Sequence, residues 1–206
     1  MPTETKSHPI FARCWQFLSA REDAAGQNEY RQELLAGARG RALELGAGNG
    51  RNFPHYPASV EQVVAIEPEP YLRERATEAA AQARVAVEVI EGTDDPLPCD
   101  DDSFDVAVVC LVLCSVPDQG RALAELRRVL RPGGELRFYE HVIARRPGQA
   151  KLFRLADRSG IWPFVGAGCH LSRDTGKAIA DAGFAIERVR QLSFNGLPHI
   201  LGVARA

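Results

Sequence analysis

Short apolar runs alternate with amphipathic stretches along most of this 206-residue chain. Apolar runs of about four to eight residues predict strands, whereas apolar residues three or four positions apart predict helices. Strands are expected at 42–46, 63–67, 85–90, 103–111, 135–140, 184–191 and 199–204. The run at 103–111 is almost continuously apolar, which is typical of a central parallel strand covered on both faces.

Helical patterns fill most of the intervals between these strands. Helices are expected at 72–83, 119–130, 147–158 and 173–182, with Ser172 as the N-cap of the last one. The segment 159–171 is rich in glycine, proline and aromatic residues and is expected to be a loop. Alternating strands and helices indicate an α/β fold with a mostly parallel sheet and helices on both faces. The turn signal Asn195-Gly196 joins the last two strands and adds an antiparallel strand in a C-terminal hairpin.

The first part of the chain has helical spacing and no strand pattern. Apolar residues recur at helical intervals over 10–18, and Gly26 is expected to interrupt the helix before a second one that carries Tyr30 and Leu34. We therefore predict an N-terminal helical lid segment over residues 1–36 and an α/β unit over 37–206. The length of the chain favours a single domain overall.

The segment 43–50 reads Leu-Glu-Leu-Gly-Ala-Gly-Asn-Gly and continues directly from a predicted strand. Its glycines permit a sharp turn and a close approach of the backbone to a ligand, and a helix is expected to follow. The spacing departs from the dinucleotide-binding pattern G-x-G-x-x-G, because Arg51 occupies the position of the third glycine. Glu67 ends the next strand, where an ionised carboxylate can accept both hydroxyls of a ribose.

Five motifs follow one another within residues 41–140. They are L-E-L-G-A-G-N-G, V-V-A-I-E-P, D-D-x-L-P, S-F-D-V and V-L-R-P-G-G-E-L. Together they resemble the methyltransferase type 11 group of class I S-adenosylmethionine-dependent methyltransferases. Segments at 111–116, 140–142, 168–175 and 197–200 resemble a narrower subfamily, the methyltransferase-like proteins whose animal members are membrane-associated alkyl-thiol methyltransferases. The sequence shows no counterpart of their hydrophobic N-terminal anchor, so no integral membrane association is expected.

The resemblance implies a Rossmann-like class I methyltransferase fold and S-adenosyl-L-methionine as the cofactor. The residues that it places at the cofactor are Glu44, Gly46, Ala47, Gly48, Gly50, Glu67, Pro68, Thr93, Asp94, Asp95, Leu111 and Trp15. Thr93 departs from the family, in which an aspartate often contacts the adenine amine here; Asp94, Asp95 or backbone groups are the alternative acceptors. Trp15 and Phe11 either cover the sulfonium through a cation–π contact or pack in the core.

Methyl transfer requires alignment, exclusion of water and, for a poor nucleophile, a base. His141, after the fifth strand, and His170, ahead of the last predicted helix, are the candidate catalytic residues. The alternative for each histidine is a structural role. Cys169 is a further candidate, or else a buried inert thiol. The apolar segment 161–165 is either a lid over the acceptor or a packing plug.

The resemblance favours a small, apolar thiol as the methyl acceptor. A thiol needs the least activation, because its reference pKa is about 8.5. A lipid, a quinone-type compound or another hydroxyl or amine is the alternative, motivated by an excess of basic residues over 121–158. A protein that binds the cofactor without catalysis is a third hypothesis.

Composition excludes several other classes of protein. A net charge of −2 argues against a general nucleic-acid binder. No apolar run approaches the roughly 18 residues of a membrane span. The five cysteines form no C-x-x-C pair, which favours reduced thiols in a cytoplasmic protein. No cluster has metal-ligand spacing, so no metal is predicted, and the oligomeric state stays open.

Overall fold

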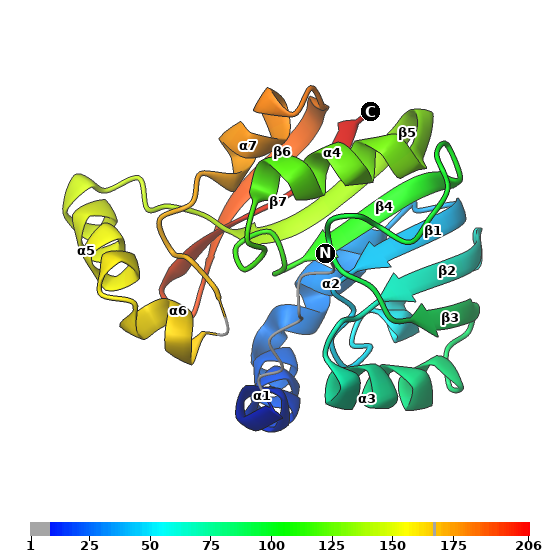
Figure 1. The fold of residues 1–206 in the computed structure, drawn as a ribbon, viewed down its shortest axis with the longest axis horizontal. Coiled ribbons are helices and arrows are strands. Elements are labelled where there is room, and N and C mark those ends of the chain that lie inside the picture. Colours follow the sequence, from blue (N-terminus) through cyan, green and yellow to red (C-terminus); the bar gives the residue numbers. More distant parts are fainter. Residues whose placement is uncertain (1–8, 167) are drawn as a thin grey trace.

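Residues 9–166 and 168–206 are described by the computed structural model, with the backbone alone at 9–11, 14–16 and 165. A seven-stranded sheet forms its centre, in the order β3-β2-β1-β4-β5-β7-β6 (Figure 1). The strands are β1 Gly40–Leu45, β2 Val60–Ile66, β3 Ala86–Ile90, β4 Phe104–Cys110, β5 Leu130–His141, β6 Ala185–Phe194 and β7 Leu197–Arg205. The helices are α1 Pro9–Glu22, α2 Asn28–Leu35, α3 Pro70–Ala80, α4 Gln119–Val129, α5 Pro147–Arg158, α6 Ile161–Val165 and α7 Thr175–Asp181.

The sheet is parallel except at β7. β1 pairs in parallel with β2 and β4, and β4 pairs in parallel with β5. β7 runs antiparallel to both of its neighbours, β5 and β6. Asn195 and Gly196 form the turn before β7, with φ of 50° and 78°, as a tight hairpin requires. The predicted sheet is thus confirmed, with the refinement that the antiparallel strand lies inside the sheet and not at its edge.

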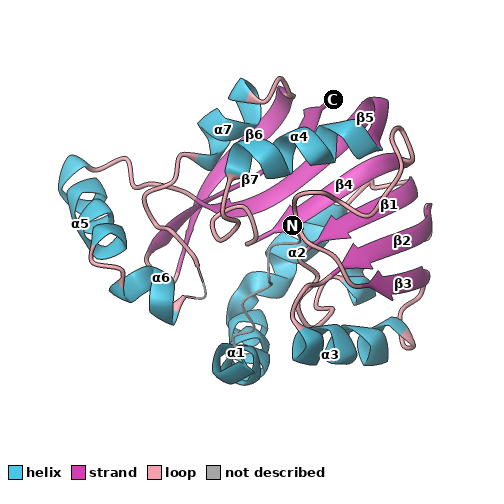
Figure 2. Cartoon of the chain, viewed as in Figure 1, coloured by secondary structure: helices cyan, strands magenta, loops and turns pink. Residues whose placement is uncertain are grey.

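Successive side chains point to opposite faces of the sheet, and helices cover each face (Figure 2). In β1, Leu43 packs in the core with residues of α4 and α7, whereas Ala42 packs in the core with residues of α2 and α3. Phe138 and Tyr139 of β5 divide between the same two cores. Burial on both faces explains why the central strands are almost continuously apolar.

A short π-helical turn, η1 (Asp23–Gln27), separates α1 from α2. Gly26 within it has a φ of 109°, a conformation that glycine adopts readily and other residues rarely adopt. The predicted interruption at Gly26 is therefore confirmed. α1 and α6 lie on the side toward which the arrowheads of β1 and β2 point (Figure 1). Within the described residues, no helix has the length and apolar character needed to cross a bilayer.

The segment after the glycine-rich turn departs from the expected helix. A single 3-10 turn, η2 (Phe53–His55), follows it. A longer helix is blocked because the ring of Pro57 would clash with the carbonyl of the residue four positions earlier. The segment 159–171, expected to be a loop, contains the short helix α6.

The expected N-cap of the last helix is also wrong. α7 begins at Thr175, and the side chain of Asp174 caps it by accepting the N–H of Lys177. Ser172 instead donates its N–H and its hydroxyl to Asp157, over 2.8 and 2.5 Å. The serine is thus used to attach the end of α5 to the segment before α7, a tertiary contact that local capping patterns do not reveal.

Candidate functional site

Four neighbouring strands end at one edge of the sheet, and parallel α/β sheets bind their ligands beyond this carboxyl edge. The glycine-rich loop (residues 46–50) follows β1, and Glu67 follows β2. Leu111 follows β4, and His141 is the last residue of β5. Because the sheet order is β2-β1-β4-β5, these predicted site residues, distant in sequence, share one edge.

Hydrogen bonds to β2 hold the glycine-rich loop. Gly46 and Ala47 donate their N–H groups to the carbonyl of Ile66, over 2.8 and 3.0 Å. The three glycines of the loop all have positive φ, at 68°, 57° and 78°. Glycine is strongly favoured in this region of backbone conformation. The alternating glycines therefore specify one turn that brings bare backbone to the edge of the sheet.

Glu67 lies beside this loop with its carboxylate buried. Its Oε2 accepts the N–H of Gly48 at 2.7 Å, and its Oε1 accepts the N–H of Glu69 at 3.0 Å. Burial raises the pKa of Glu67 to about 7, although both backbone hydrogen bonds favour the ionised form. A carboxylate has about four acceptor sites, so two remain for hydroxyl groups of a ligand. Pro68 comes next, and its carbonyl accepts a hydrogen bond from Arg73 at 3.0 Å.

Glu44 lies beneath the loop, and both of its oxygens are engaged by the protein. Its Oε1 accepts from the side-chain amide of Asn52 at 2.9 Å, and its Oε2 accepts from the hydroxyl of Tyr56 at 2.8 Å. The carboxyl group is fully buried, and burial raises its pKa to about 7. Glu44 is therefore placed to brace the chain that follows the loop.

Substitution of Gly46 by alanine is expected to destabilise the fold and the loop by about 1–3 kcal/mol. A Cβ at Gly46 would lie 2.6 Å from Cγ2 of Val112, and the φ of 68° adds strain. Adding Val112→Ala should recover part of the loss, because it removes the colliding methyl group but not the backbone strain. Urea unfolding of Gly46→Ala, Val112→Ala and the double variant separates the collision from the backbone strain. If the loss of unfolding free energy in the double variant equals the sum of the two single losses, the proposed collision is contradicted.

A buried arginine links the N-terminal helices to this part of the site. Arg31 of α2 donates to Asp23 at 3.1 Å, to Gln27 at 3.0 Å and to Asn52 at 2.9 Å. Asn52 in turn donates to Glu44, so the network continues beneath the loop. Sequence reasoning missed Arg31, since nothing in a polar helix marks a charged side chain as buried. The available signal was the spacing of Asp23, Gln27 and Arg31 at intervals of four residues.

α1 also contacts the glycine-rich loop. The side-chain amide of Asn49 donates to the hydroxyl of Ser19 at 3.1 Å, and Arg51 lies 3.5 Å from Asp23. The covering role expected for the N-terminal segment stays a prediction. Trp15 belongs to α1, but its side chain lies outside the described part of the chain, so its contact with the cofactor stays a prediction.

The loop after β3 carries Thr93, Asp94 and Asp95. Asp95 accepts a hydrogen bond from Arg121 of α4 at 3.3 Å, and the Thr93 hydroxyl lies 3.5 Å from the carbonyl of Asp95. Asp94 is half-buried, and burial raises its pKa. Because Asp95 is engaged by α4, Asp94 is the better placed of the two acids to accept a hydrogen bond from a ligand.

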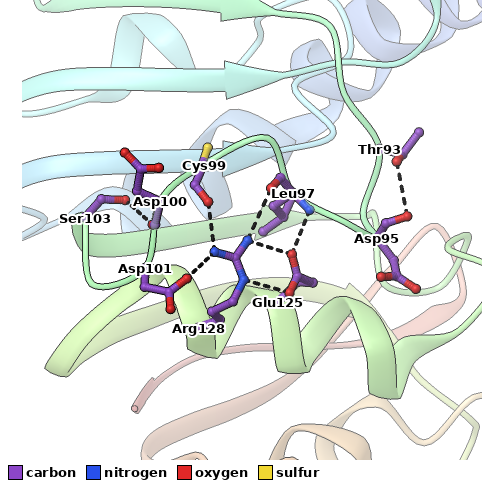
Figure 3. Close-up of polar contacts among 9 residues, drawn as sticks. All are labelled: Thr93, Asp95, Leu97, Cys99, Asp100, Asp101, Ser103, Glu125 and Arg128. Atoms are coloured by element: carbon purple, nitrogen blue, oxygen red, sulfur yellow. Dashed lines mark hydrogen bonds and ion pairs between the residues drawn. The ribbon is translucent and has the colours of Figure 1, made fainter. Parts of the chain in front are cut away.

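Arg128 of α4 fixes the remainder of this loop (Figure 3). Its guanidinium donates to the carbonyls of Leu97 and Cys99, over 3.2 and 2.9 Å. It also pairs with Glu125 at 2.7 Å and with Asp101 at 2.6 Å. Sequence reasoning counted Arg128 only as part of the basic stretch and missed this clamp, which holds the loop against α4.

The loop after β4 is organised by a buried glutamate. Glu140 accepts the N–H groups of Val112, Leu113 and Cys114, over 2.9, 3.1 and 3.3 Å. Burial raises the pKa of Glu140 to about 7. Leu111, with a φ of 61°, turns the chain at the start of this loop. The glutamate thereby fixes three consecutive residues at the carboxyl edge.

His141 is partly buried among other side chains. Its Nδ1 lies 3.5 Å from the sulfur of Cys169, and its ring centroid lies 4.3 Å from that of His199. Burial and the neighbouring His141 lower the pKa of His199 to about 3, so His199 is neutral and its Nδ1 donates to the carbonyl of Leu197 at 2.9 Å. His199 therefore packs as a neutral ring against the ring of His141.

His170 is the more exposed of the two candidate histidines, with 37% of its side chain accessible. Its Nδ1 lies 3.9 Å from Asp157, a carboxylate that also accepts the N–H of Leu171 at 3.0 Å. The backbone N–H of His170 donates to the carbonyl of Cys114 at 2.8 Å. This contact joins the segment before α7 to the loop after β4.

Cys114, His141 and Cys169 come together from three segments of the chain. Their sulfur and ring nitrogen atoms all lie within 4.8 Å of one another. The neighbouring Cys114 thiol lowers the pKa of Cys169, and the proximity of Cys169 together with burial raises the pKa of Cys114. Sequence reasoning missed this cluster because it searched for closely spaced ligands. The available signal was the position of Cys114 and His141 near the carboxyl ends of two adjacent strands.

Glu22, at the end of α1, adds an unpaired acceptor to this side of the site. Its Oε2 is buried and has no hydrogen-bond partner among the described residues. Burial raises the pKa of Glu22, and the charges of His141 and Arg31 oppose that rise. Buried polar groups without partners are rare, so this oxygen is suited to a donor on a ligand.

The chain has clear relatives of known class. Residues 43–138 match the family described as a methyltransferase domain. The human thiol S-methyltransferase TMT1B is 38% identical over 180 residues, which cover 82% of this chain and 73% of the relative. The human thiol S-methyltransferase TMT1A is 36% identical over 170 residues, which cover 79% and 69%.

Solved structures share the fold. An S-adenosylmethionine-dependent methyltransferase from Thermotoga maritima has a TM-score of 0.67 at 22% identity, covering 95% of this chain and 98% of its own. Another, from Mesorhizobium loti, has a TM-score of 0.65 at 20% identity, covering 85% and 95%. The fold and these relatives show that the chain belongs to the S-adenosylmethionine-dependent methyltransferases, Rossmann-like enzymes that use S-adenosyl-L-methionine as their cofactor.

Proposed function

We propose that this enzyme transfers a methyl group from S-adenosyl-L-methionine to the sulfur of a small, apolar thiol. The observation that carries the proposal is the 38% identity, over most of the chain, to a protein named as a thiol S-methyltransferase. Exposed apolar side chains on α1 and α6 support an apolar acceptor, among them Phe17, Ile161 and Phe164, which are 76%, 70% and 82% exposed. Apolar side chains exposed in this way favour contact with an apolar molecule.

The residues at the carboxyl edge suit the parts of the cofactor. The glycine-rich loop approaches the methionine part and the ribose, and Glu67 accepts the ribose hydroxyls. Asp94 accepts from the adenine amine, while Glu44 supports the loop from below. Pro68, Leu111 and Trp15 supply apolar contacts. When bound, the cofactor supplies an electrophilic methyl group on a positively charged sulfur.

The acceptor thiol has to lose its proton before its sulfur can attack. Two imidazoles are available for this proton at the far end of the site. His141 lies beside Cys169 and is shielded from solvent on its His199 side. His170 is partly exposed and can release a proton to water. The enzyme therefore needs to align the sulfur and to exclude water more than it needs a strong base.

A panel of methyl acceptors tests the proposal. We expect kcat/KM for small alkyl thiols to exceed that for size-matched alcohols, phenols and amines by at least about tenfold, equivalent to ~1.4 kcal/mol of transition-state stabilisation. Preferred turnover of a phenol or an amino-lipid would assign the acceptor to another class. Binding of S-adenosylhomocysteine without turnover of any acceptor would indicate a cofactor-binding protein without catalysis.

Affinity for S-adenosylhomocysteine is expected to increase several-fold as the pH rises from about 6 to about 8. The reason is the pKa of Glu67, about 7, since the ionised carboxylate accepts two ribose hydroxyls and the protonated form loses one acceptor. The stability of the cofactor-free protein is expected to depend on pH in the opposite direction. Because the fold raises the pKa of Glu67, this group contributes stability at low pH that is lost as the pH rises through about 7.

Calorimetric titration of the wild type and of Glu67→Gln measures this dependence. The variant should bind with nearly constant affinity over the same pH range. Glu44 and Glu140 also have pKa values raised to about 7 by burial. An unchanged pH dependence in the variant would therefore assign the effect to one of these two groups and contradict the role of Glu67.

We also propose a cytoplasmic location and a small-molecule acceptor rather than a nucleic acid. The four cysteines with described side chains, Cys99, Cys110, Cys114 and Cys169, are free thiols, which supports a reducing compartment. The division into a lid over 1–36 and a domain over 37–206 stays a prediction, as does the absence of nucleic-acid binding. Fractionation of cells that express the tagged protein would test the location.

A further inference from the structure

Two cysteines and a histidine form a compact group at the acceptor end of the site. Cys114 and Cys169 are buried, with 1% and 7% of their surface exposed. The sulfur of Cys169 lies 3.5 Å from Nδ1 of His141, and the three ligand atoms lie within 4.8 Å of one another. Buried groups of this kind at such separations are those that proteins use to bind transition metals.

The separations fit a tetrahedral zinc ion. Zn–S bonds of about 2.3 Å and Zn–N bonds of about 2.0–2.1 Å place neighbouring ligand atoms about 3.5–3.8 Å apart. The observed 3.5 Å between Cys169 and His141 falls in this range. The third ligand atom, the sulfur of Cys114, lies within 4.8 Å of the other two, so a movement of about 1 Å at most separates it from the same distance.

The two cysteines are held in place through their backbones. The N–H of Cys114 donates to Glu140 at 3.3 Å, and its carbonyl accepts from His170 at 2.8 Å. Just before Cys169, Gly168 has a φ of 91°, and a Cβ there would lie only 3.0 Å from the carbonyl of Ser115. The two loops therefore pack closely, and each sulfur is presented from a fixed backbone.

The ring of His141 is oriented by its surroundings as well. The ring of His199 lies against it at an interplanar angle of 49° and limits its rotation, and the hydroxyl of Thr175 donates to the His141 carbonyl at 3.2 Å. Residues that orient the ligands are a regular feature of metal sites.

A buried polar atom without a partner borders the same space. Oε2 of Glu22 is unpaired among the described residues, and Glu22 is close enough to His141 for the two charges to interact. Trp162 packs against the apolar cluster that contains both cysteines, and its indole N–H faces Cys169. Since buried polar groups are normally satisfied, a further group is expected in this space.

We propose that Cys114, His141 and Cys169 bind one Zn²⁺ ion and leave its fourth coordination position open. Two thiolates and an imidazole favour zinc over magnesium or calcium, which prefer oxygen ligands. Three protein ligands with one open position are typical of catalytic zinc, whereas structural sites have four. This proposal replaces the prediction from the sequence that no metal is bound.

The open position is suited to the acceptor, a step that rests on the proposed function. An acceptor R–SH would bind zinc as the thiolate. Because His141 is then a zinc ligand and no longer available as a base, the proton would be released through His170 to water. A lone pair on the bound sulfur then attacks the methyl carbon, and the bond from that carbon to the sulfonium sulfur breaks with its electron pair. The products are the thioether R–S–CH₃, which leaves the zinc, and neutral S-adenosylhomocysteine.

Metal content and cobalt spectroscopy test the site. The full chain, reduced and loaded with zinc, is dialysed and its zinc measured by mass spectrometry; one zinc per chain is expected. Replacement of zinc by Co²⁺ should produce a thiolate-to-cobalt charge-transfer band and the intense d–d bands of a tetrahedral site. Absence of bound zinc, or a cobalt spectrum without the charge-transfer band, would overturn the proposal.

Matched cysteine variants locate the metal. Cys114→Ser and Cys169→Ser should each lower zinc affinity by at least about tenfold, whereas Cys99→Ser, a half-buried thiol outside the cluster, should leave it unchanged. Equal affinity in all three variants would overturn the assignment. So would a Cys114–Cys169 disulfide that persists in the reduced, zinc-treated protein. If a cluster variant does not fold, the cobalt spectrum of the wild type still decides.

The metal site and the proposed function fail in different experiments. Zinc binding with no methylation of any thiol would leave the site in place and refute the thiol acceptor. Thiol methylation that proceeds equally in the wild type and in zinc-free Cys169→Ser would support the acceptor and remove zinc from the reaction. The expected result is one zinc per chain and a parallel loss of zinc and thiol turnover in Cys169→Ser.

Discussion

Replacing Glu67 with glutamine is expected to weaken the binding of S-adenosylhomocysteine by about 2–3 kcal/mol, roughly 30- to 150-fold. The carboxylate offers two free acceptor sites beside the glycine-rich loop, while its other sites hold the N–H groups of Gly48 and Glu69. Glutamine keeps the size but removes the charge and presents an NH₂ group where an acceptor is needed. The loss should therefore appear in cofactor binding; folding is expected to lose at most the one backbone hydrogen bond, from Gly48 or Glu69, that would face the NH₂ group.

Calorimetry measures the affinity, with Glu61→Gln as the matched control. Glu61 lies on the same strand, β2, but is exposed to solvent. The control should bind within about twofold of the wild type, because isolated surface changes are usually worth less than about 0.5 kcal/mol. A loss of less than about threefold in Glu67→Gln would show that the ribose is not held at this carboxylate.

Replacing Arg31 with methionine is expected to lower the free energy of unfolding by about 3–5 kcal/mol. The guanidinium is buried and bonded to Asp23, Gln27 and Asn52. Removal leaves the Asp23 carboxylate buried, with Arg51 at 3.5 Å as its remaining ion pair among the described residues. The melting temperature should fall by roughly 10 °C, at about 2–4 °C per kcal/mol for a chain of this size.

Arg190→Met provides the comparison, since Arg190 pairs with Glu33 of the same helix, α2, at the surface. An exposed pair is worth about 0–1 kcal/mol, so this variant should melt close to the wild type. A second variant, Asp23→Asn with Arg31→Met, should recover part of the loss because it removes the unpaired charge. Equal stability of Arg31→Met and Arg190→Met would contradict the buried network.

The order of strands and helices could be predicted because each element has its own local periodicity of apolar residues. The strand at 103–111 and the helix at 147–158 have local patterns, and both are found within a residue or so of their predicted bounds. The insertion of β7 between β5 and β6 depends on tertiary pairing, which no local pattern records. Ser172 failed as a helix cap for the same reason, because its partner Asp157 lies in another helix.

The candidate site likewise has one part that sequence spacing reveals and another that only the fold brings together. The glycine-rich loop and Glu67 lie close together in sequence, so spacing alone indicates a nucleotide-type ligand. The cluster of Cys114, His141 and Cys169 is assembled from two strand ends and a loop, and only the fold brings its members together. Arg31 was missed because burial of a charged side chain depends on partners elsewhere in the chain.

Transfer of a labelled methyl group from the cofactor to a thiol can be followed by mass spectrometry. The reduced, zinc-loaded enzyme is incubated with cofactor that carries a trideuterated methyl group and with a small alkyl thiol. We expect a thioether that contains all three deuterium atoms and one S-adenosylhomocysteine for each thioether formed. Cofactor that binds without forming a labelled thioether would contradict methyl transfer to a thiol. The binding control is that Glu61→Gln and the wild type bind S-adenosylhomocysteine equally under the same conditions.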